Sequence, residues 1–276
     1  MPKVLSPAEI ESYERDGFLA PVEVMSAEEA RDVRARLEAA ETYYPEAFGG
    51  AGRNNAHLLL GFLDAIVRDA RVLDAVEDLI GPDILAYGTV IFAKDPGGPG
   101  YVSWHQDGAY MGLDPFPGVT AWLALTPSTP ESGCMAMIPG SHRLGRRDHL
   151  ETFAEENILT RGQAIQGVEA AAAVELVLAP GQMSLHHPWV IHGSQPNRGA
   201  DRRIGFAIQS YVAPSARQVL GAGYAQLVRG DDTYGHFEPL PSPRADMDPG
   251  SQAARAEVNG AWAEILYQGA ERRRDY

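Results

Sequence analysis

The sequence has a single cysteine, Cys134, among its 276 residues. One cysteine cannot form a disulfide within the chain, and it fits a protein of a reducing compartment. The sequence also lacks any run of the roughly 20 apolar residues that a membrane-spanning helix needs, and its first residues lack the apolar core of a signal peptide. These absences predict a cytoplasmic protein without a membrane partner.

Positive charge is scarce as well. The chain has 23 Lys and Arg residues against 37 Asp and Glu, which gives a net charge of −14. A surface of this sign repels phosphates, so we expect no nucleic acid and no anionic membrane as a partner. The hydrophobic content of 45% is ordinary, and the length suffices for a sizeable core. We expect a soluble protein that acts on a small molecule, and the sequence does not indicate its oligomeric state.

The first part of the chain has the signals of helices. Two capping boxes, each a serine followed three residues later by a glutamate, begin at Ser6 and Ser26. A third helix is expected at 72–80, because apolar residues recur there at helical spacing and a Gly-Pro pair follows. Residues 6–81 are therefore expected to form a helical N-terminal part.

The pattern changes after this part. Short apolar or alternating runs follow, separated by glycine and proline, at 84–93, 102–107, 119–125, 134–138, 174–178, 183–187 and 203–212. Such runs predict an antiparallel sandwich or jelly roll at about 84–213. Residues 145–173 are expected to form an insertion with some helix, and 214–276 to form loops with a terminal helix near 252–268. We expect one domain over 1–276 that is mainly β with helical decoration.

The most informative motif is His105-Gln106-Asp107. Side chains alternate along a strand, so His105 and Asp107 are expected to face the same side. Two imidazoles and one carboxylate on one side of a metal are typical of an iron(II) site with open positions. Among the other histidines, His192 is the best third ligand, because it ends an expected strand before a polar turn. Zinc hydrolysis is disfavoured, since the chain has neither an H-E-x-x-H motif nor a cysteine cluster.

An arginine eleven residues after His192 indicates which small molecule binds at the open positions of the metal. If the intervening turn is a hairpin, alternation places Arg203 on a small and polar face with Gly205, Ala207, Gln209 and Tyr211. The planar guanidinium binds a carboxylate bidentately. We therefore expect a small dicarboxylate at Arg203, and we prefer Arg203 to its neighbour Arg202, which lies on the other face.

Several further motifs follow one another in order. They are Trp104-His105-Gln106-Asp107, Thr120-Ala121-Trp122, Glu131-Ser132-Gly133-Cys134, Ile138-Pro139-Gly140-Ser141-His142, Ala179-Pro180-Gly181 and His192-Gly193-Ser194 with Arg203. Over about residues 5–240 the chain resembles the phytanoyl-CoA dioxygenase family of iron(II)/2-oxoglutarate oxygenases. The resemblance implies a double-stranded β-helix, which is a cupin-like jelly roll.

The resemblance also implies the roles of the main residues. His105, Asp107 and His192 would bind Fe(II), and Arg203 would bind the distal carboxylate of 2-oxoglutarate, with dioxygen as the second cosubstrate. The implied reaction is oxidation, above all hydroxylation, of a C–H bond of a small metabolite. Related aliphatic halogenases have a small residue at the carboxylate position, so Asp107 favours hydroxylation over chlorination.

Around the cosubstrate, the resemblance implies Ser194, Trp122 and Gln106. Trp122 also follows from alternation in its own strand, whereas alternation points Gln106 away from His105. Many relatives have a lysine near the cosubstrate where this chain has Asn55. Other contacts are therefore expected to replace that lysine.

The substrate itself is not specified by these motifs. Large side chains that flank the ligand strands are candidates for its pocket, namely Phe92, Tyr110, Met111, Trp189 and Tyr211. The chain resembles small bacterial members that oxidise free metabolites, although a coenzyme A thioester stays possible. Two alternatives remain open. The same oxidising chemistry can give ring closure, desaturation or epimerisation, and the chain could be a silent metal- or ligand-binding β domain.

Overall fold

The computed structural model describes residues 2–49, 53–159, 161–270 and 273. Its α-helices are α1 (Pro7–Asp16), α2 (Ala27–Tyr43), α3 (Pro45–Phe48), α4 (Gly61–Val67), α5 (Ala70–Ile80), α6 (Gly108–Met111) and α7 (Pro249–Leu266). Short 3-10 helices are η2 (Ala56–Leu58), η3 (Ser141–Leu144) and η4 (Ala170–Ala172). The strands are β1 (Phe18–Glu23), β2 (Ile84–Ala86), β3 (Thr89–Lys94), β4 (Val102–His105), β5 (Gly118–Ala124), β6 (Met135–Met137), β7 (Leu150–Glu151), β8 (Gln163–Ala164), β9 (Val174–Glu175), β10 (Gln182–His186), β11 (His192–Ser194), β12 (Arg203–Val212), β13 (Tyr224–Arg229) and β14 (Glu238–Pro239).

The predicted helix starts are confirmed. In both α1 and α2 the capping serine accepts from a backbone N–H three residues on, and the glutamate at that position accepts from the backbone N–H of the serine. These reciprocal bonds satisfy donors that a helix end leaves free. The third predicted helix is α5, which ends at Gly81. Among the described residues, no helix is both long enough and apolar enough to cross a membrane.

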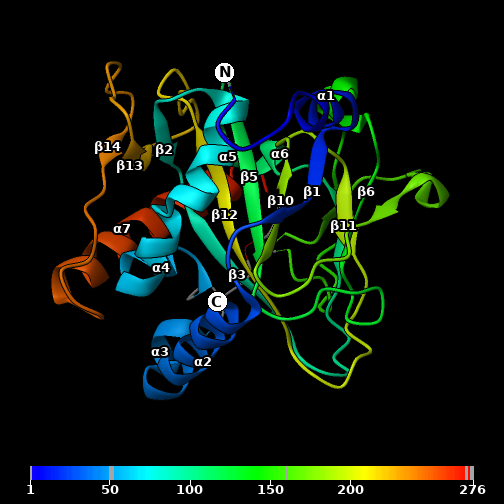
Figure 1. Ribbon diagram of the computed structural model, residues 1–276, viewed down its shortest axis with the longest axis horizontal. Coiled ribbons are helices and arrows are strands. Elements are labelled where there is room, and N and C mark those ends of the chain that lie inside the picture. The colour runs from blue at the N-terminus through cyan, green and yellow to red at the C-terminus, as the bar shows by residue number, and fades with distance from the viewer. Residues whose placement is uncertain (1, 50–52, 160, 271–272, 274–276) are drawn as a thin grey trace.

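Two sheets form the core of the fold. The large sheet has the order β1-β10-β5-β12-β2-β13-β14, with β3 also paired to β12, and the small sheet has the order β4-β11-β6-β9. Figure 1 shows the strands of the large sheet through the middle of the molecule, with α4 and α5 on one side and β6 and β11 on the other. This arrangement confirms the jelly-roll prediction. The single-domain organisation stays a prediction.

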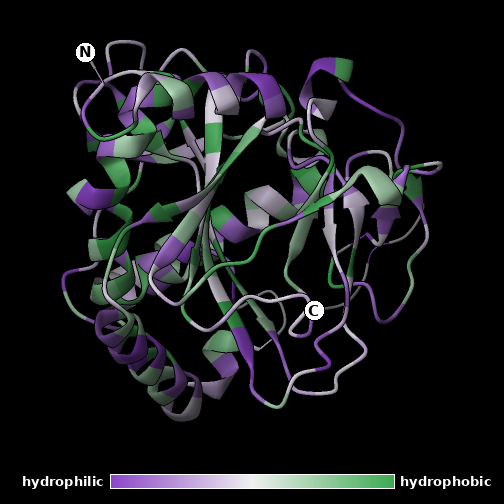
Figure 2. Ribbon diagram, turned by 45° about the vertical axis from the view of Figure 1, so that its right-hand side comes forward, coloured by the Kyte–Doolittle hydropathy of each residue, from purple (hydrophilic) through white to green (hydrophobic). Residues whose placement is uncertain are grey.

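The two faces of the large sheet pack differently. One face joins α2, α4 and α5 in the main hydrophobic cluster, which includes Leu37, Leu63 and Phe206. The other face meets the small sheet through a smaller cluster that contains Trp122 and Met137. In Figure 2 the central strands are mostly hydrophobic or neutral, and the peripheral helices carry hydrophilic stripes. Two different hydrophobic clusters therefore cover the two faces of the large sheet.

Three strands of the large sheet lie outside the predicted runs. β1 comes from the part expected to be helical and pairs with β10 at the sheet edge. Its Pro21 interrupts the apolar pattern, and an edge strand tolerates proline because one side of it needs no hydrogen-bond donor. β13 and β14 come from the segment expected to be loops. Within its described residues, the insertion at 145–173 contains the paired strands β7 and β8 and the short 3-10 helix η4.

A bulge in β12 changes the predicted face of one residue. Pairing with β5 shifts register between Ile208 and Tyr211, and Ser210 has a φ of 88°. A bulge inserts one residue, so the side chains after it exchange faces. Tyr211 therefore joins the main cluster, and its hydroxyl donates to the Val67 carbonyl at 2.8 Å. The predicted face holds for Arg203 and is wrong for Tyr211.

Candidate metal centre and cosubstrate pocket

Three predicted ligands meet between the two sheets. His105 ends β4 and lies opposite His192, which begins β11. Asp107 Oδ1 lies 3.3 Å from His105 Nε2 and 3.7 Å from His192 Nε2. A potential ligand atom of each residue lies within 4.8 Å of those of the other two, and all three residues are buried. This donor set fits iron(II) bound on one face.

The chain reaches this geometry by a route that strand alternation did not predict. β4 ends at His105, and Asp107 has helical dihedral angles, φ −55° and ψ −44°, at the start of α6. The turn brings the carboxylate back to the imidazole. Gln106 points away, because its Nε2 donates to the carbonyls of Gly145 and Trp189. Its amide therefore holds two loops together, and the predicted contact of Gln106 with the cosubstrate stays a prediction without support from these bonds.

Backbone carbonyls orient both imidazoles. His105 Nδ1 donates to the Ser103 carbonyl at 2.9 Å, and His192 Nδ1 donates to the Val190 carbonyl at 3.1 Å. Each bond leaves Nε2 as the unprotonated nitrogen of a neutral ring, which is the form that binds a metal. Burial, with repulsion from His105, lowers the pKa of His192 to about 3. His192 is therefore a ready ligand at neutral pH.

The carboxylate of Asp107 is held on its other oxygen. Oδ2 accepts from Thr120 Oγ1 at 3.1 Å and from His186 Nε2 at 3.2 Å. Burial opposes ionisation of Asp107, yet the influence of His192, His105 and His186 outweighs it and holds the pKa of this carboxyl well below its usual range. Asp107 is therefore ionised, and its Oδ1 faces the two histidines.

His186 was not predicted as part of the site. It lies opposite Thr120 in the pairing of β10 with β5, and it is buried. The missed signal was the alternation of β10, which puts Ser184 and His186 on one face while the apolar Met183 and Leu185 join the main cluster. Such partners of a ligating carboxylate orient it and strengthen metal binding.

Arg203 lies on β12 and is 2% exposed. Its guanidinium stacks on the Trp122 ring at 4.5 Å, and its Nε donates to Ser128 Oγ at 3.2 Å. Nη2 is buried without a hydrogen-bond partner among the described residues. Burial lowers the pKa of Arg203 to about 10, so the group is still charged at neutral pH. A buried, partly unpaired cation fits an anionic ligand.

One cavity joins Arg203 to the metal ligands. It is lined by side chains of both sheets, which include His105, Asp107, Trp122, His192, Ser194 and Arg203. A Cβ atom added at Gly205 would lie 1.8 Å from the Trp122 ring. Glycine at this position therefore gives Trp122 the space to lie beneath the guanidinium. Ser194 and Trp122 lie where the resemblance implied a cosubstrate, and their contact with it stays a prediction.

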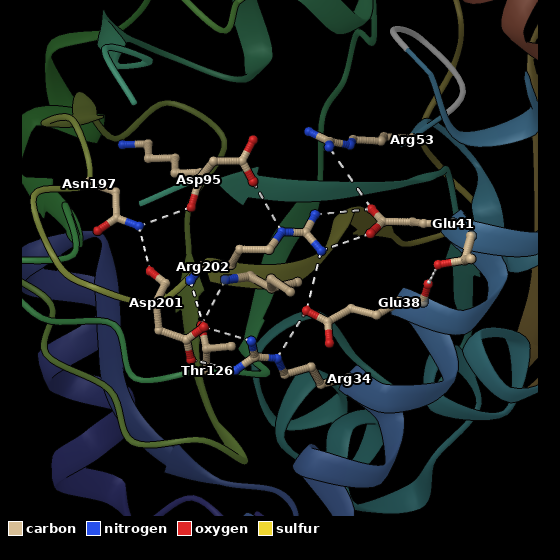
Figure 3. Close-up of polar contacts among 12 residues, drawn as sticks. Arg34, Glu38, Glu41, Arg53, Asp95, Thr126, Asn197, Asp201 and Arg202 are labelled. Atoms are coloured by element: carbon tan, nitrogen blue, oxygen red, sulfur yellow. Dashed lines mark hydrogen bonds and ion pairs between the residues drawn. The ribbon is translucent and has the colours of Figure 1, made fainter. Parts of the chain in front are cut away.

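The neighbouring Arg202 points toward acidic side chains on α2 (Figure 3). Its guanidinium pairs with Glu41 at 2.8 Å and with Glu38 at 3.3 Å, both on α2, and with Asp95 at 3.2 Å. These partners satisfy its charge at the surface. The preference for Arg203 over Arg202 agrees with this arrangement.

A second buried cation at the pocket was missed. Lys94 ends β3, lies opposite Arg203 in the strand register, and is 5% exposed. Its Nζ donates to Ser194 Oγ at 2.6 Å. Its place in the site depends on the pairing of β3 with β12, which the local sequence pattern does not show. Asn55 does not replace a lysine here, because its amide bonds to Asn259 and to the backbone of Thr89.

A larger cavity of about 330 Å³ opens from His105 and Asp107. Three of the predicted pocket residues line it, namely Phe92, Tyr110 and Met111. Much of the remaining wall comes from α7 and the residues after it, with Trp262, Leu266 and Tyr267. The sequence pattern gave no role to these residues. We call this cavity the chamber.

Two predicted pocket residues lie outside the chamber. Trp189 packs edge to face against Phe116, with ring centroids 6.4 Å apart. It lines an outer cleft of about 900 Å³ that adjoins the chamber and shares Tyr110 with it. Tyr211 lies on the opposite face of the sheet because of the bulge described above. Its predicted place in the pocket is therefore wrong.

Comparisons with known proteins point to one family. The sequence model of the phytanoyl-CoA dioxygenase (PhyH) family matches residues 13–205. A "probable alpha-ketoglutarate-dependent hypophosphite dioxygenase" of Stutzerimonas stutzeri is 31% identical over 67% of this chain and 62% of its own length. A "1-deoxypentalenic acid 11-beta-hydroxylase" of Streptomyces arenae is 36% identical over 40% of this chain and 40% of its own length. The chain thus spans less than two thirds of these curated relatives.

Solved structures match over more of the chain. The apo form of a non-heme monooxygenase, ThoJ, is 32% identical, with a TM-score of 0.85 over 96% of this chain and 99% of its own. A structure of CytC3 with Fe(II) and alpha-ketoglutarate is 25% identical, with a TM-score of 0.65 over 86% of this chain and 98% of its own. The family match, the order of the motifs and the shared fold agree: the chain belongs to the phytanoyl-CoA dioxygenase family.

Proposed function

We propose that the protein is an iron(II)- and 2-oxoglutarate-dependent oxygenase that hydroxylates a C–H bond of a small metabolite. One observation carries the proposal: a buried two-histidine, one-carboxylate set shares a cavity with a buried arginine, one nitrogen of which has no partner among the described residues. The names of relatives support it, since they include an alpha-ketoglutarate-dependent dioxygenase and a hydroxylase.

Each residue has a defined part in this proposal. His105, Asp107 and His192 hold the metal, and Arg203 binds the distal carboxylate of 2-oxoglutarate. When bound, iron(II) with 2-oxoglutarate and dioxygen supplies the oxidising chemistry and releases succinate and carbon dioxide. The two sheets exclude water, and the chamber holds the substrate beside the metal. Asp107 fills the carboxylate position, which supports hydroxylation rather than halogenation.

The residues that line the chamber support the proposal that the substrate is largely apolar. Its wall is mainly aromatic and aliphatic, and Arg53 is the only Lys or Arg among its described lining residues. A cavity of about 330 Å³ is at the lower end of small-molecule pockets. Because no group of cations lines it, the chamber favours a free metabolite over a coenzyme A thioester.

Coupled turnover tests the proposal. Purified protein with Fe(II) and 2-oxoglutarate should form succinate, and His105→Ala or Asp107→Ala should reduce this to the level of metal-free protein. His236→Ala is a matched control, because His236 lies outside the site and bonds to the Ala216 carbonyl. Full succinate formation by either ligand variant would contradict the site.

Two other outcomes are distinguishable. Ring closure or desaturation removes two hydrogens from the product, epimerisation leaves its mass unchanged, and hydroxylation adds one oxygen, so mass spectrometry of the product separates them. A silent binding domain would show no charge-transfer absorbance with Fe(II) and 2-oxoglutarate under anaerobic conditions. The cytoplasmic location, supported by the single cysteine, and the absence of nucleic-acid and membrane partners remain part of the proposal.

A further inference from the structure

Two cations are buried side by side at one end of the cosubstrate pocket. Lys94 and Arg203 are register partners on β3 and β12, and they are 5% and 2% exposed. Like charges in a buried environment repel, and each loses its hydration. Burial, with repulsion from Arg203, lowers the pKa of Lys94 to about 7. The protein therefore bears a cost to keep a lysine at this position.

No carboxylate offsets these charges within the described residues. The hydrogen-bond acceptors of Lys94 are Ser194 Oγ at 2.6 Å, the Gly133 carbonyl at 3.4 Å and the Gln195 carbonyl. Arg203 donates to the Ser128 hydroxyl, and its Nη2 has no partner in this part of the chain. Neutral acceptors satisfy hydrogen bonds but not net charge. The pair is thus suited to an anion that comes from outside the chain.

The hydrogen bond between Lys94 and Ser194 has a defined donor and acceptor. When Lys94 is protonated, its ammonium group only donates, so Ser194 Oγ accepts from it. The hydroxyl hydrogen of Ser194 is then left free to donate to another group. Ser194 lines the same cavity as Arg203 and the metal ligands. Lys94 itself is not among the lining residues, so it acts on the cavity through Ser194 and through its charge.

We propose that Lys94 is a positioning residue for the anionic end of the cosubstrate. It orients the Ser194 hydroxyl as a donor to the distal carboxylate and places a second positive charge behind it. This inference rests on the proposed function. It adds a residue to the site and accounts for a buried lysine in a chain that has only one other, Lys3.

Calorimetric titration of 2-oxoglutarate into Ni(II)-loaded protein tests this role without turnover. Lys94→Met removes the charge and keeps the side-chain length. A hydrogen bond to a charged group is strong enough that we expect a roughly tenfold to hundredfold rise in the Kd for 2-oxoglutarate. The Kd for Ni(II) should not change. Lys3→Met is the matched control, because Lys3 is exposed and pairs with Glu77 at the surface.

A second ligand separates the two ends of the cosubstrate. In 2-oxopentanoate a methyl group replaces the distal carboxylate, and the metal-binding end is unchanged. Its affinity should be the same in wild type and Lys94→Met. If Lys94→Met binds 2-oxoglutarate, 2-oxopentanoate and Ni(II) all more weakly than wild type, Lys94 only supports the structure and the proposal is wrong. Lys94→Gln keeps a donor without the charge, and it provides a folded variant if Lys94→Met does not fold.

A double-mutant cycle tests the path through Ser194. The fold-change caused by Lys94→Met should be smaller in a Ser194→Ala background than in wild type, because the hydroxyl that Lys94 orients is gone. Equal fold-changes in both backgrounds, or a Kd for 2-oxoglutarate within about twofold of wild type in Lys94→Met, would overturn the role. If wild-type protein does not bind 2-oxoglutarate at all, the proposed function fails instead.

Discussion

The cosubstrate pocket and the chamber share His105 and Asp107 but are built differently. The pocket lies between two sheets, and hydrogen bonds to backbone or neighbouring side chains fix its main polar groups. The chamber has a strand wall on one side, and α6, α7 and part of the insertion form the rest. Rigid strands hold the chemistry in place, whereas the segments that differ most easily in length and sequence surround the substrate.

This difference predicts which substitutions affect which function. Changes in the pocket should reduce metal or cosubstrate binding regardless of the substrate. Changes in the chamber should alter the choice of substrate and leave both of those affinities unchanged.

Arg203→Met should have the largest effect on cosubstrate binding. It removes the charge-assisted hydrogen bonds available to a carboxylate, so we expect the Kd for 2-oxoglutarate to rise at least about a hundredfold. Calorimetry on Ni(II)-loaded protein measures this Kd. Arg202→Met is the matched control, since Arg202 pairs with α2 at the surface. A similar loss of affinity in both variants would contradict the distinction between the two arginines.

The second-largest effect is expected from removing the hydrogen-bond donors to Asp107, which should lower the affinity for the metal. Thr120→Val keeps the shape of the side chain and deletes one hydrogen bond to Oδ2, and His186→Leu deletes the other. Loss of such a partner costs about tenfold to a hundredfold in metal affinity. Titration with Fe(II) under anaerobic conditions measures it. Thr42→Val, at an exposed helix position, should have no effect. Unchanged metal affinity in both site variants would show that Asp107 needs no orienting partners.

A substitution in the chamber should have the smallest effect on the binding of metal and 2-oxoglutarate. Trp262 stacks on Tyr87 with ring centroids 5.4 Å apart, and it lines the chamber from α7. Trp262→Ala should lower the free energy of unfolding by about 3 kcal/mol, the lower end for a tryptophan, because Trp262 is only partly buried and its loss leaves a void. The Kd values for metal and 2-oxoglutarate should stay within about twofold of wild type. Thermal unfolding and calorimetry check both, and a loss of 2-oxoglutarate binding would mean that α7 supports the pocket as well.

The comparison also explains what could be predicted from the sequence. His105, Asp107, His192 and Arg203 lie at strand ends or on strand faces, where residue spacing translates directly into position. The route to Asp107 could not be predicted in this way, because a helix begins there. Tyr211 was placed wrongly because alternation does not reveal a bulge at Ser210.

The missed residues share one physical reason. Lys94 and His186 belong to the site through strand pairing, which depends on partners far along the chain. Trp262 reaches the chamber through the docking of the C-terminal helix, and its local pattern does not show where that helix packs. Local periodicity predicts which face a residue occupies but not what lies opposite that face.

Titration of 2-oxoglutarate with and without metal is the most direct test of the central claim. If the three ligands and Arg203 form one site, the protein should bind 2-oxoglutarate tightly when loaded with Ni(II) and at least tenfold more weakly without metal. In anaerobic Fe(II)-loaded protein the same titration should produce a charge-transfer absorbance band. Binding of equal strength with and without metal would contradict a shared site for the metal and the dicarboxylate.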